Sequence, residues 1–195
     1  MGSSANVGSA LFEAFDPVGC TDAWYDKWKR DPNSKYHALI HRVLERGGTD
    51  EEAALAIRAR WHDVGSEASR LGTAIHLYAE LRANRVSVDV PNELLKEVQQ
   101  LNSFLRSSFV RDAGLQPYRT ELAVAFRVEG RAVTAGQIDA LYRGAAGEYT
   151  VIDYKRVAAH HALQPWATAF RDAYGKPPVD LLPDTPFWRY SLQQV

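Results

Sequence analysis

Cysteine is almost absent from this 195-residue chain, in which Cys20 is the single example. One cysteine cannot form a disulfide within the chain, so the fold does not rest on covalent cross-links, and an intracellular location of unknown compartment is expected. The chain also lacks an apolar run approaching the roughly 18 residues that a membrane span requires, and no signal-peptide pattern is evident. These absences predict a protein without a membrane partner.

An excess of charge of one sign is also missing. The chain has 23 basic and 24 acidic residues and a formal net charge of −1. This balance argues against binding nucleic acid through the whole surface, although a single basic groove remains compatible with it. A hydrophobic content of 46% and a charged content of 24% are typical of a globular protein, so composition leaves the function open.

Helical periodicity dominates residues 21–113. Four helices are expected. The first has Ser34 as its cap and Gly47 as its stop, and the second begins with a capping box of Thr49 and Glu52. A break at Gly65 precedes the third, which covers 67–83, and Pro91 and Gly114 limit the fourth. The apolar stripe of the fourth helix consists of Leu94, Leu95, Val98, Leu101, Leu105 and Phe109. The N-terminal half is therefore expected to be α-helical.

The pattern changes after Tyr118. Strands are expected over 121–128, 133–142 and 149–155, and turns at Glu129-Gly130 and 144–147 join them into an antiparallel meander. A weak helix over 160–174, a loop over 177–186 and the start of a helix over 187–195 are expected to follow. The expected fold class is α+β. Residues 1–60 would form a helical extension or cap, and residues 61–195 the core.

Two aspartates of this meander carry the strongest chemical signal. If the second and third strands fold about the turn at 144–147, Asp139 lies opposite residue 152 or 153, which brings it to Asp153 with Cβ atoms about 5 Å apart. Opposed like charges destabilise a sheet unless something neutralises them, and oxygen ligands suit Mg²⁺ or Mn²⁺. Glu121 on the neighbouring strand would add a further carboxylate.

Strand alternation places Lys155 on the same side as Asp153 and Val151, whereas Ile152 and Tyr154 project to the other side. An ammonium group there can orient a water or stabilise charge on a phosphate. The alternative is a surface hairpin in which Asp153 and Lys155 form a weak ion pair. The apolar residues around both aspartates favour the metal site, because charges in buried strands are rare without a partner.

A histidine on the third expected helix is a further candidate. His76 shares a helix face with Gly72 and Glu80, each four residues away. A glycine within a helix often marks a close approach by backbone or ligand. Taken alone, His76 is more often a histidine beside the core than a ligand.

Together these elements resemble the PD-(D/E)XK nuclease superfamily, in particular its RecB-like and lambda-exonuclease-like group. The matching residues follow in order over about 61–195: Gly72-x-x-x-His76, Glu121, Gly136-x-x-Asp139, Asp153-Tyr154-Lys155 and Tyr190-x-x-Gln193. The chain departs from the pattern because the tyrosine that usually follows the glutamine by four residues would fall at position 197, so the core is expected to be shortened at its C-terminus.

The resemblance implies a nuclease of the restriction-endonuclease-like fold that hydrolyses phosphodiester bonds in DNA, as an exonuclease on single strands or ends. It implies His76, Asp139, Asp153 and the Tyr154 carbonyl as ligands of Mg²⁺ or Mn²⁺, with Lys155 as the catalytic lysine. Gln193 of the Tyr190 motif would contact substrate. Glu80 and Glu121 receive supporting roles, since these positions are often acidic in the family.

Other residues are weaker candidates for contacts with DNA. Arg156, Arg119 and Lys96 are expected to meet phosphates, and Tyr36, Trp61 or Trp188 to stack on bases, although packing in the core is the commoner role of such aromatic residues.

Two alternative functions stay open at this point. One is an inactive nucleic-acid-binding module with a nuclease-like fold, and the other is a metal hydrolase acting on RNA or nucleotides, for which the pair His160-His161 is a weak ligand set because adjacent side chains point apart. Protein partners, polarity of digestion and oligomeric state are not indicated by the sequence.

Overall fold

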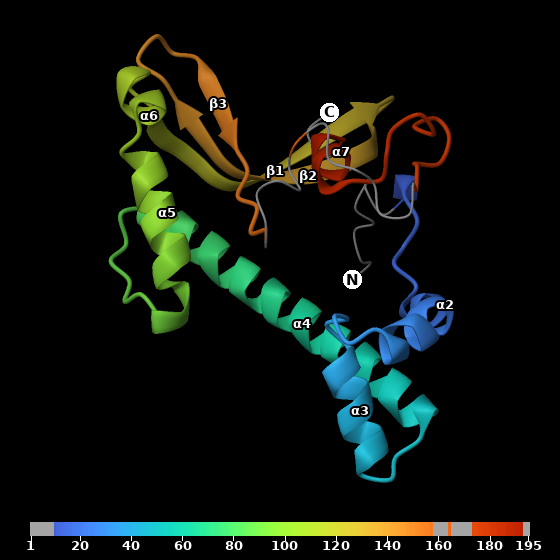
Figure 1. Ribbon diagram of the computed structural model, residues 1–195. Coiled ribbons are helices and arrows are strands. Elements are labelled where there is room, and N and C mark those ends of the chain that lie inside the picture. The colour runs from blue at the N-terminus through green and yellow to red at the C-terminus, as the bar shows by residue number, and fades with distance from the viewer. Residues whose placement is uncertain (1–9, 158–163, 165–172, 193–195) are drawn as a thin grey trace. The chain divides into compact units, whose positions relative to one another are not determined.

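The computed structural model describes residues 10–157, 164 and 173–192, and it combines helices with an antiparallel sheet, as the α+β expectation requires (Figure 1). In chain order the elements are α2 (Pro17–Arg30), α3 (His37–Glu45), α4 (Asp50–Ala83), the 3₁₀ turn η1 (Asn92–Leu94), α5 (Leu95–Leu105), α6 (Ser108–Asp112), β1 (Gln116–Val128), β2 (Arg131–Arg143), β3 (Tyr149–Ile152) and α7 (Pro186–Ser191). Among these described elements, no helix is both long enough and apolar enough to cross a membrane.

The chain divides into two compact units. Unit 1 comprises residues 1–63 and 157–195, and unit 2 comprises residues 64–156. The sequence suggested a division after residue 60, close to the first of these boundaries, but it placed all later residues in one core. Helix α4 runs through the boundary, and the two units are described separately below.

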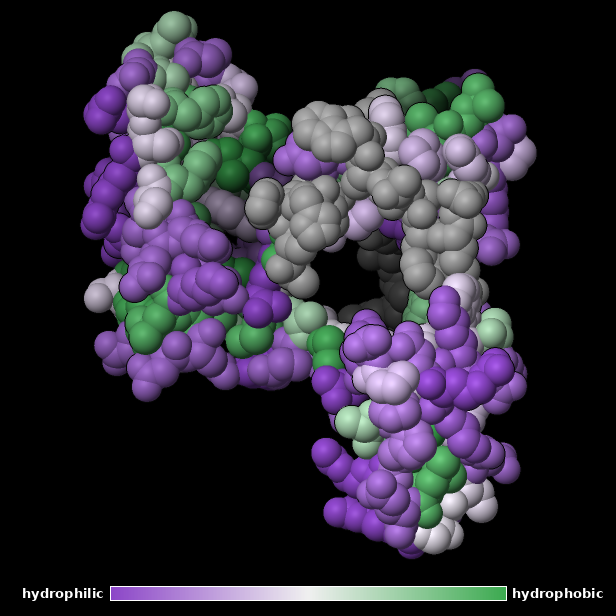
Figure 2. All heavy atoms as spheres, viewed as in Figure 1, coloured by the Kyte–Doolittle hydropathy of each residue, from purple (hydrophilic) through white to green (hydrophobic). Residues whose placement is uncertain are grey.

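Unit 1 is organised around a small aromatic core. Tyr36, Ile40, Ala53 and Ile57 are buried together, and Trp61 packs against them. The indole N–H of Trp61 donates a hydrogen bond to the Tyr36 hydroxyl at 2.6 Å. Tyr36 is 7% exposed, so its proposed role in stacking on bases is wrong. In Figure 2 hydrophilic residues cover most of the visible face of α3, as expected for a helix with one buried stripe.

Helix α4 confirms one expected signal and overturns another. The capping box is formed, because the Thr49 N–H donates to Glu52 Oε2 at 2.7 Å and the Glu52 N–H donates to Thr49 Oγ1 at 3.2 Å. The break expected at Gly65 is wrong, since the 34-residue helix continues through this position. A glycine costs only about 1 kcal/mol in a helix. The helix is held on one side of Gly65 by Ile57 in the unit 1 core and on the other by Leu71 in unit 2.

Two apolar clusters form the core of unit 2. The first joins the second half of α4 to α5 through Leu71, Ile75, Ala79, Leu94, Val98 and Leu101. The second joins α6 to the sheet through Val110, Leu115, Ala140 and Tyr142. Leu105 and Tyr154 pack against both clusters. The helices therefore cover the sheet face that carries Ala140, Tyr142 and Ile152.

The sheet has three strands in the order β1-β2-β3, all antiparallel, which confirms the meander. β2 pairs with β3 from Ala140↔Ile152 to Arg143↔Tyr149, so the expected register is also confirmed. Because β3 is short, residues 131–139 of β2 pair with β1 alone and form a two-stranded ribbon. Residues 153–155 follow the end of β3 rather than lying within it, contrary to expectation.

The helix expected from Pro91 to Gly114 is interrupted. It consists of η1, α5 and α6, with Ser107 as the N-cap of α6. Leu95 and Phe109 are 46% and 56% exposed, so both are wrong as members of the buried stripe. Phe109 lies in a new helix that begins after Ser107, whose hydroxyl accepts from the Val110 N–H, so it does not continue the stripe of α5. Leu95 is the first residue of α5 and follows the 3₁₀ turn η1.

Candidate metal centre

Three side chains from three different elements converge in unit 2. His76 of α4, Glu121 of β1 and Asp139 of β2 each offer one ligand atom, and these atoms all lie within 4.8 Å of one another. All three side chains are partly buried. Among the described residues, this is the single group of three or more histidine, cysteine or acidic side chains with that spacing.

The register of β1 and β2 places Glu121 directly opposite Asp139. The pairs Thr120↔Ala140 and Leu122↔Ile138 lie on either side of them. Glu121 has a φ of +49°, a left-handed conformation that costs a residue with a Cβ free energy within a strand. A hydrogen bond from Asn84 Nδ2 to Thr120 Oγ1 at 3.0 Å fixes the preceding residue to the end of α4. The chain thus holds Glu121 in a strained position at the site.

The electrostatics of Glu121 show that the site concentrates negative charge. Burial raises the pKa of Glu121, and the carboxylates of Asp139 and Glu80 raise it further, against smaller opposing effects of His76 and of a hydrogen bond from Gln137. That bond runs from Gln137 Nε2 to Glu121 Oε2. A cation between Glu121 and Asp139 would remove the repulsion.

The orientation of His76 leaves one ring nitrogen directed at the acidic pair. Its Nε2 donates a hydrogen bond to the Tyr154 carbonyl at 2.6 Å, since a carbonyl oxygen can only accept. Nδ1 lies 3.6 Å from Asp139 Oδ2. In the neutral imidazole Nδ1 therefore carries a lone pair that faces a carboxylate. This arrangement is typical of a metal-ligating histidine whose other nitrogen is held by a carbonyl.

The peptide groups of Tyr154 connect the members of the site. The Tyr154 N–H donates to Asp139 Oδ2 at 2.7 Å, and its carbonyl accepts from His76. The ring of Tyr154 is anchored in the two apolar clusters, and burial together with a hydrogen bond to Tyr142 raises the pKa of its hydroxyl. A partly buried side chain thus fixes the backbone that orients both His76 and Asp139.

Asp153 and Lys155 lie beside this group. Lys155 Nζ contacts Asp153 Oδ1 at 2.9 Å, which is the ion pair that the surface-hairpin alternative describes. The other oxygen, Asp153 Oδ2, is buried and has no hydrogen-bond partner among the described residues. Asp153 is not a member of the three-residue group, because β3 ends at Ile152 and the ladder that would hold Asp153 against Asp139 stops one pair earlier.

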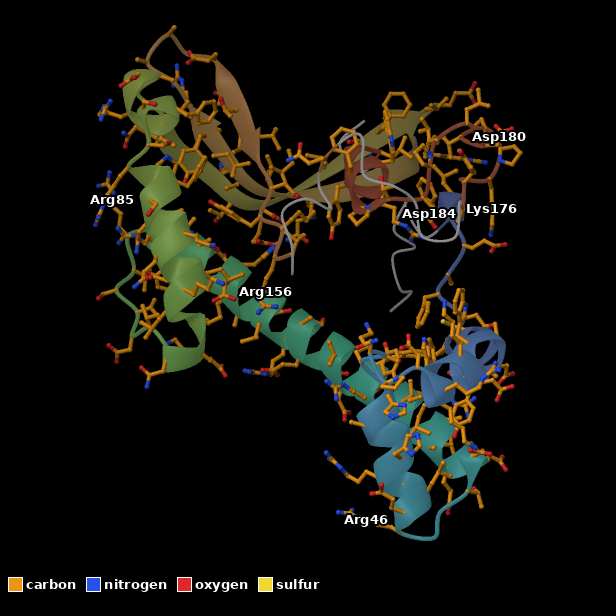
Figure 3. The ribbon with its side chains drawn as sticks, viewed as in Figure 1. Arg46, Arg85, Arg156, Lys176, Asp180 and Asp184 are labelled. Atoms are coloured by element: carbon orange, nitrogen blue, oxygen red, sulfur yellow. The ribbon has the colours of Figure 1, made fainter. Side chains whose placement is uncertain are left out.

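The remaining candidates are dispersed. Glu80 lies one turn from His76 on α4 and acts electrostatically on Glu121. Arg156, which Figure 3 labels, pairs with Glu97 at 2.8 Å, and this contact lowers the pKa of Glu97. Arg119 and Lys96 are exposed. No close approach explains Gly72, because a Cβ built there would meet no atom within 4 Å.

Other expected contacts belong to the rest of the chain. Tyr190 lies on α7 of unit 1, and Trp188 on the same helix is partly buried. Gln193 and the pair His160-His161 lie outside the described residues.

Sequence reasoning missed Gln137 and Asn84. Gln137 is two residues before Asp139, so strand alternation already placed both on one side of β2. Asn84 gave no signal, because its partner Thr120 is 36 residues away.

Comparison of the chain with family models, with curated proteins and with solved structures finds no match in any of the three.

Proposed function

We propose that this protein is a divalent-metal-dependent nuclease that hydrolyses phosphodiester bonds in DNA. The observation that carries the proposal is the convergence of His76, Glu121 and Asp139 within 4.8 Å. The nuclease chemistry and the DNA substrate rest on the ordered motifs of the sequence, including Asp153-Tyr154-Lys155, that resemble the PD-(D/E)XK superfamily.

The donor set fits Mg²⁺ or Mn²⁺. Two carboxylates and one imidazole form a hard, mostly oxygen ligand set, which favours Mg²⁺ or Mn²⁺ over metals that prefer thiolates. The pKa of Glu121 is raised first by burial and then by the carboxylates of Asp139 and Glu80, whose negative charge a cation would neutralise. The buried, unpartnered Asp153 Oδ2 is an acceptor that a metal-bound water would satisfy.

Different residues of the site would bind the ion, orient its ligands and assist the reaction. A bound divalent cation would polarise the phosphate and lower the pKa of a coordinated water. His76, Glu121 and Asp139 would hold it, and the Tyr154 peptide groups would keep His76 and Asp139 oriented. Lys155, held at 2.9 Å by Asp153, would orient the attacking water or stabilise the charge that develops on the phosphate.

Metal binding can be tested separately from cleavage. We expect the full chain to bind Mn²⁺ in calorimetry, and Asp139→Asn to weaken that binding at least about tenfold, since a charged ligand is lost. Asp89→Asn is the matched control, because Asp89 is exposed and outside the group. Equal Mn²⁺ affinity in all three proteins would contradict the metal centre.

Cleavage is then measured on end-labelled single-stranded and double-stranded DNA with Mg²⁺ or Mn²⁺. We expect cleavage by the unaltered chain, none with a chelator, and a loss of about a hundredfold or more in Lys155→Met. Linear and circular single strands distinguish exonuclease from endonuclease action. Binding of Mn²⁺ and DNA without cleavage would identify the inactive binding module instead, and cleavage restricted to RNA or nucleotides would identify the other hydrolase.

A further inference from the structure

Unit 2 contains a cavity of about 500 Å³ between its two apolar clusters. Its walls include Leu101 of the first cluster, Val110 and Leu115 of the second, and Tyr154, which packs against both. The cavity opens to solvent beside Val86 and Ser87, and its volume lies within the range of small-molecule sites. The apolar walls require an occupant with an apolar body.

The cavity is also lined by two cations. Arg82 and Arg85, at the end of α4 and just after it, are exposed lining residues (Figure 3 labels Arg85). Neither guanidinium makes an ion pair or a hydrogen bond with any residue that the structure describes. Two unpaired guanidinium groups beside an apolar cavity select an anionic head group.

The backbone of Arg85 adds an independent observation. Its φ is +61°, and the Val86 N–H bonds to the Leu81 carbonyl at 2.8 Å, which is the helix end that normally carries glycine. An arginine is strained at this position. Backbone strain of this kind is frequent at ligand-binding sites.

We propose that this cavity binds an organic anion with an apolar body, of the class of a medium-chain carboxylic acid. The hydrocarbon chain of the ligand enters between the helices and the sheet and packs against Leu101, Val110 and Leu115. Its carboxylate pairs with Arg82 and Arg85. The site is separate from the metal centre, although Tyr154 lines the cavity and its peptide groups bond to His76 and Asp139.

Calorimetry on the full chain without metal tests the proposal with decanoate as the probe. We expect decanoate to bind at micromolar concentration, decanol to bind at least about tenfold more weakly because it lacks the charge, and acetate not to bind. Failure of decanoate to bind, equal binding of decanol, or binding of a 5′-mononucleotide in place of decanoate would each overturn the proposal.

Variants locate the binding. Arg85→Gly removes the cation and also relieves the strain, so decanoate affinity is expected to fall while the melting temperature stays equal or rises. Arg82→Gln should weaken binding in the same direction, and Ser87→Trp should block it, because Ser87 is an exposed lining residue. Arg46→Gly is the control, since Arg46 caps α3 in unit 1. Unchanged affinity in Arg85→Gly and Arg82→Gln, or loss of it in Arg46→Gly, would contradict the site.

Discussion

Glu121 combines two unfavourable features at one residue. Its φ of +49° is strained, and its carboxylate faces that of Asp139. Replacement by glycine removes both, so we expect Glu121→Gly to raise the free energy of unfolding of the metal-free protein by about 1 kcal/mol. Urea denaturation measures this change. Ala123→Gly, on the same strand without strain, should be destabilising. A Glu121→Gly variant less stable than the unaltered chain would show that strain and charge repulsion at Glu121 do not destabilise the protein.

The raised pKa of Glu121 makes the metal-free stability depend on pH. Proton release from Glu121 is harder in the folded than in the unfolded state, because its pKa is raised on folding. The ionised carboxylate therefore destabilises the folded protein. This destabilisation is absent below the ordinary glutamate pKa of about 4.3 and grows as pH rises through the raised pKa. We therefore expect Glu121→Gln to match the unaltered chain in acid and to become the more stable protein towards neutrality. Melting temperatures between pH 4 and 8, with chelator present, measure the difference. Saturating Mn²⁺ should make the unaltered chain the more stable of the two proteins at neutral pH. A higher melting temperature of Glu121→Gln found only in acid would contradict this expectation.

The sequence predicted individual residues of the site better than their grouping. The position of Asp139 near the end of β3 and the register of β2 with β3 followed from turn length and strand alternation, which are local properties. His76 was singled out by its helix spacing to Gly72 and Glu80, and its role as a ligand came from the family resemblance. Glu121 received a supporting role, because nothing in the local pattern reveals a left-handed residue within a strand. The position of Asp153 depends on where β3 ends, and the strand ends at Ile152 although the sequence pattern predicts that it continues to Lys155.

At the scale of the element, α4 shows why a glycine in a helical segment does not by itself predict a break. Residues 62–70 are exposed on all sides, and Gly65 has no atom within 4 Å of its missing Cβ. Local propensity alone therefore allows a break there. The capping box at Thr49 and the packing of Ile57 and Leu71 on the two sides of Gly65 stabilise a continuous helix. Such non-local packing is not visible in a sequence window.

This arrangement predicts a simple stabilising substitution. Gly65→Ala adds a methyl group in open space and lowers the backbone entropy of the unfolded chain, so we expect a gain of about 0.5–1 kcal/mol. Hydrogen exchange of the amides in 62–70 measures the local gain. Gly65→Pro should accelerate exchange there, because proline disrupts a helix interior. Faster exchange in Gly65→Ala would show that the helix is not continuous at this point.

At the scale of the whole molecule, the three proposed metal ligands and the residue that orients two of them belong to unit 2. His76, Glu121, Asp139 and Tyr154 all lie within residues 64–156. We expect Mn²⁺ to slow amide exchange around these residues and to leave α2 and α3 of unit 1 unchanged, because a ligand stabilises the structure that binds it. Cys20, which is 6% exposed, gives a chemical control, since its reaction with a thiol reagent requires unit 1 to open. A reaction rate that falls on addition of Mn²⁺ would show that the units are coupled.

Tyr154 supports His76 and Asp139 through its main chain and not through its phenol. Side-chain scanning at this position would therefore report on packing alone and would overlook the chemical contribution. Replacing the 153–154 amide by an ester deletes one donor while every side chain stays in place. Semisynthesis is thus the route by which the contribution of this linkage to ion affinity can be measured.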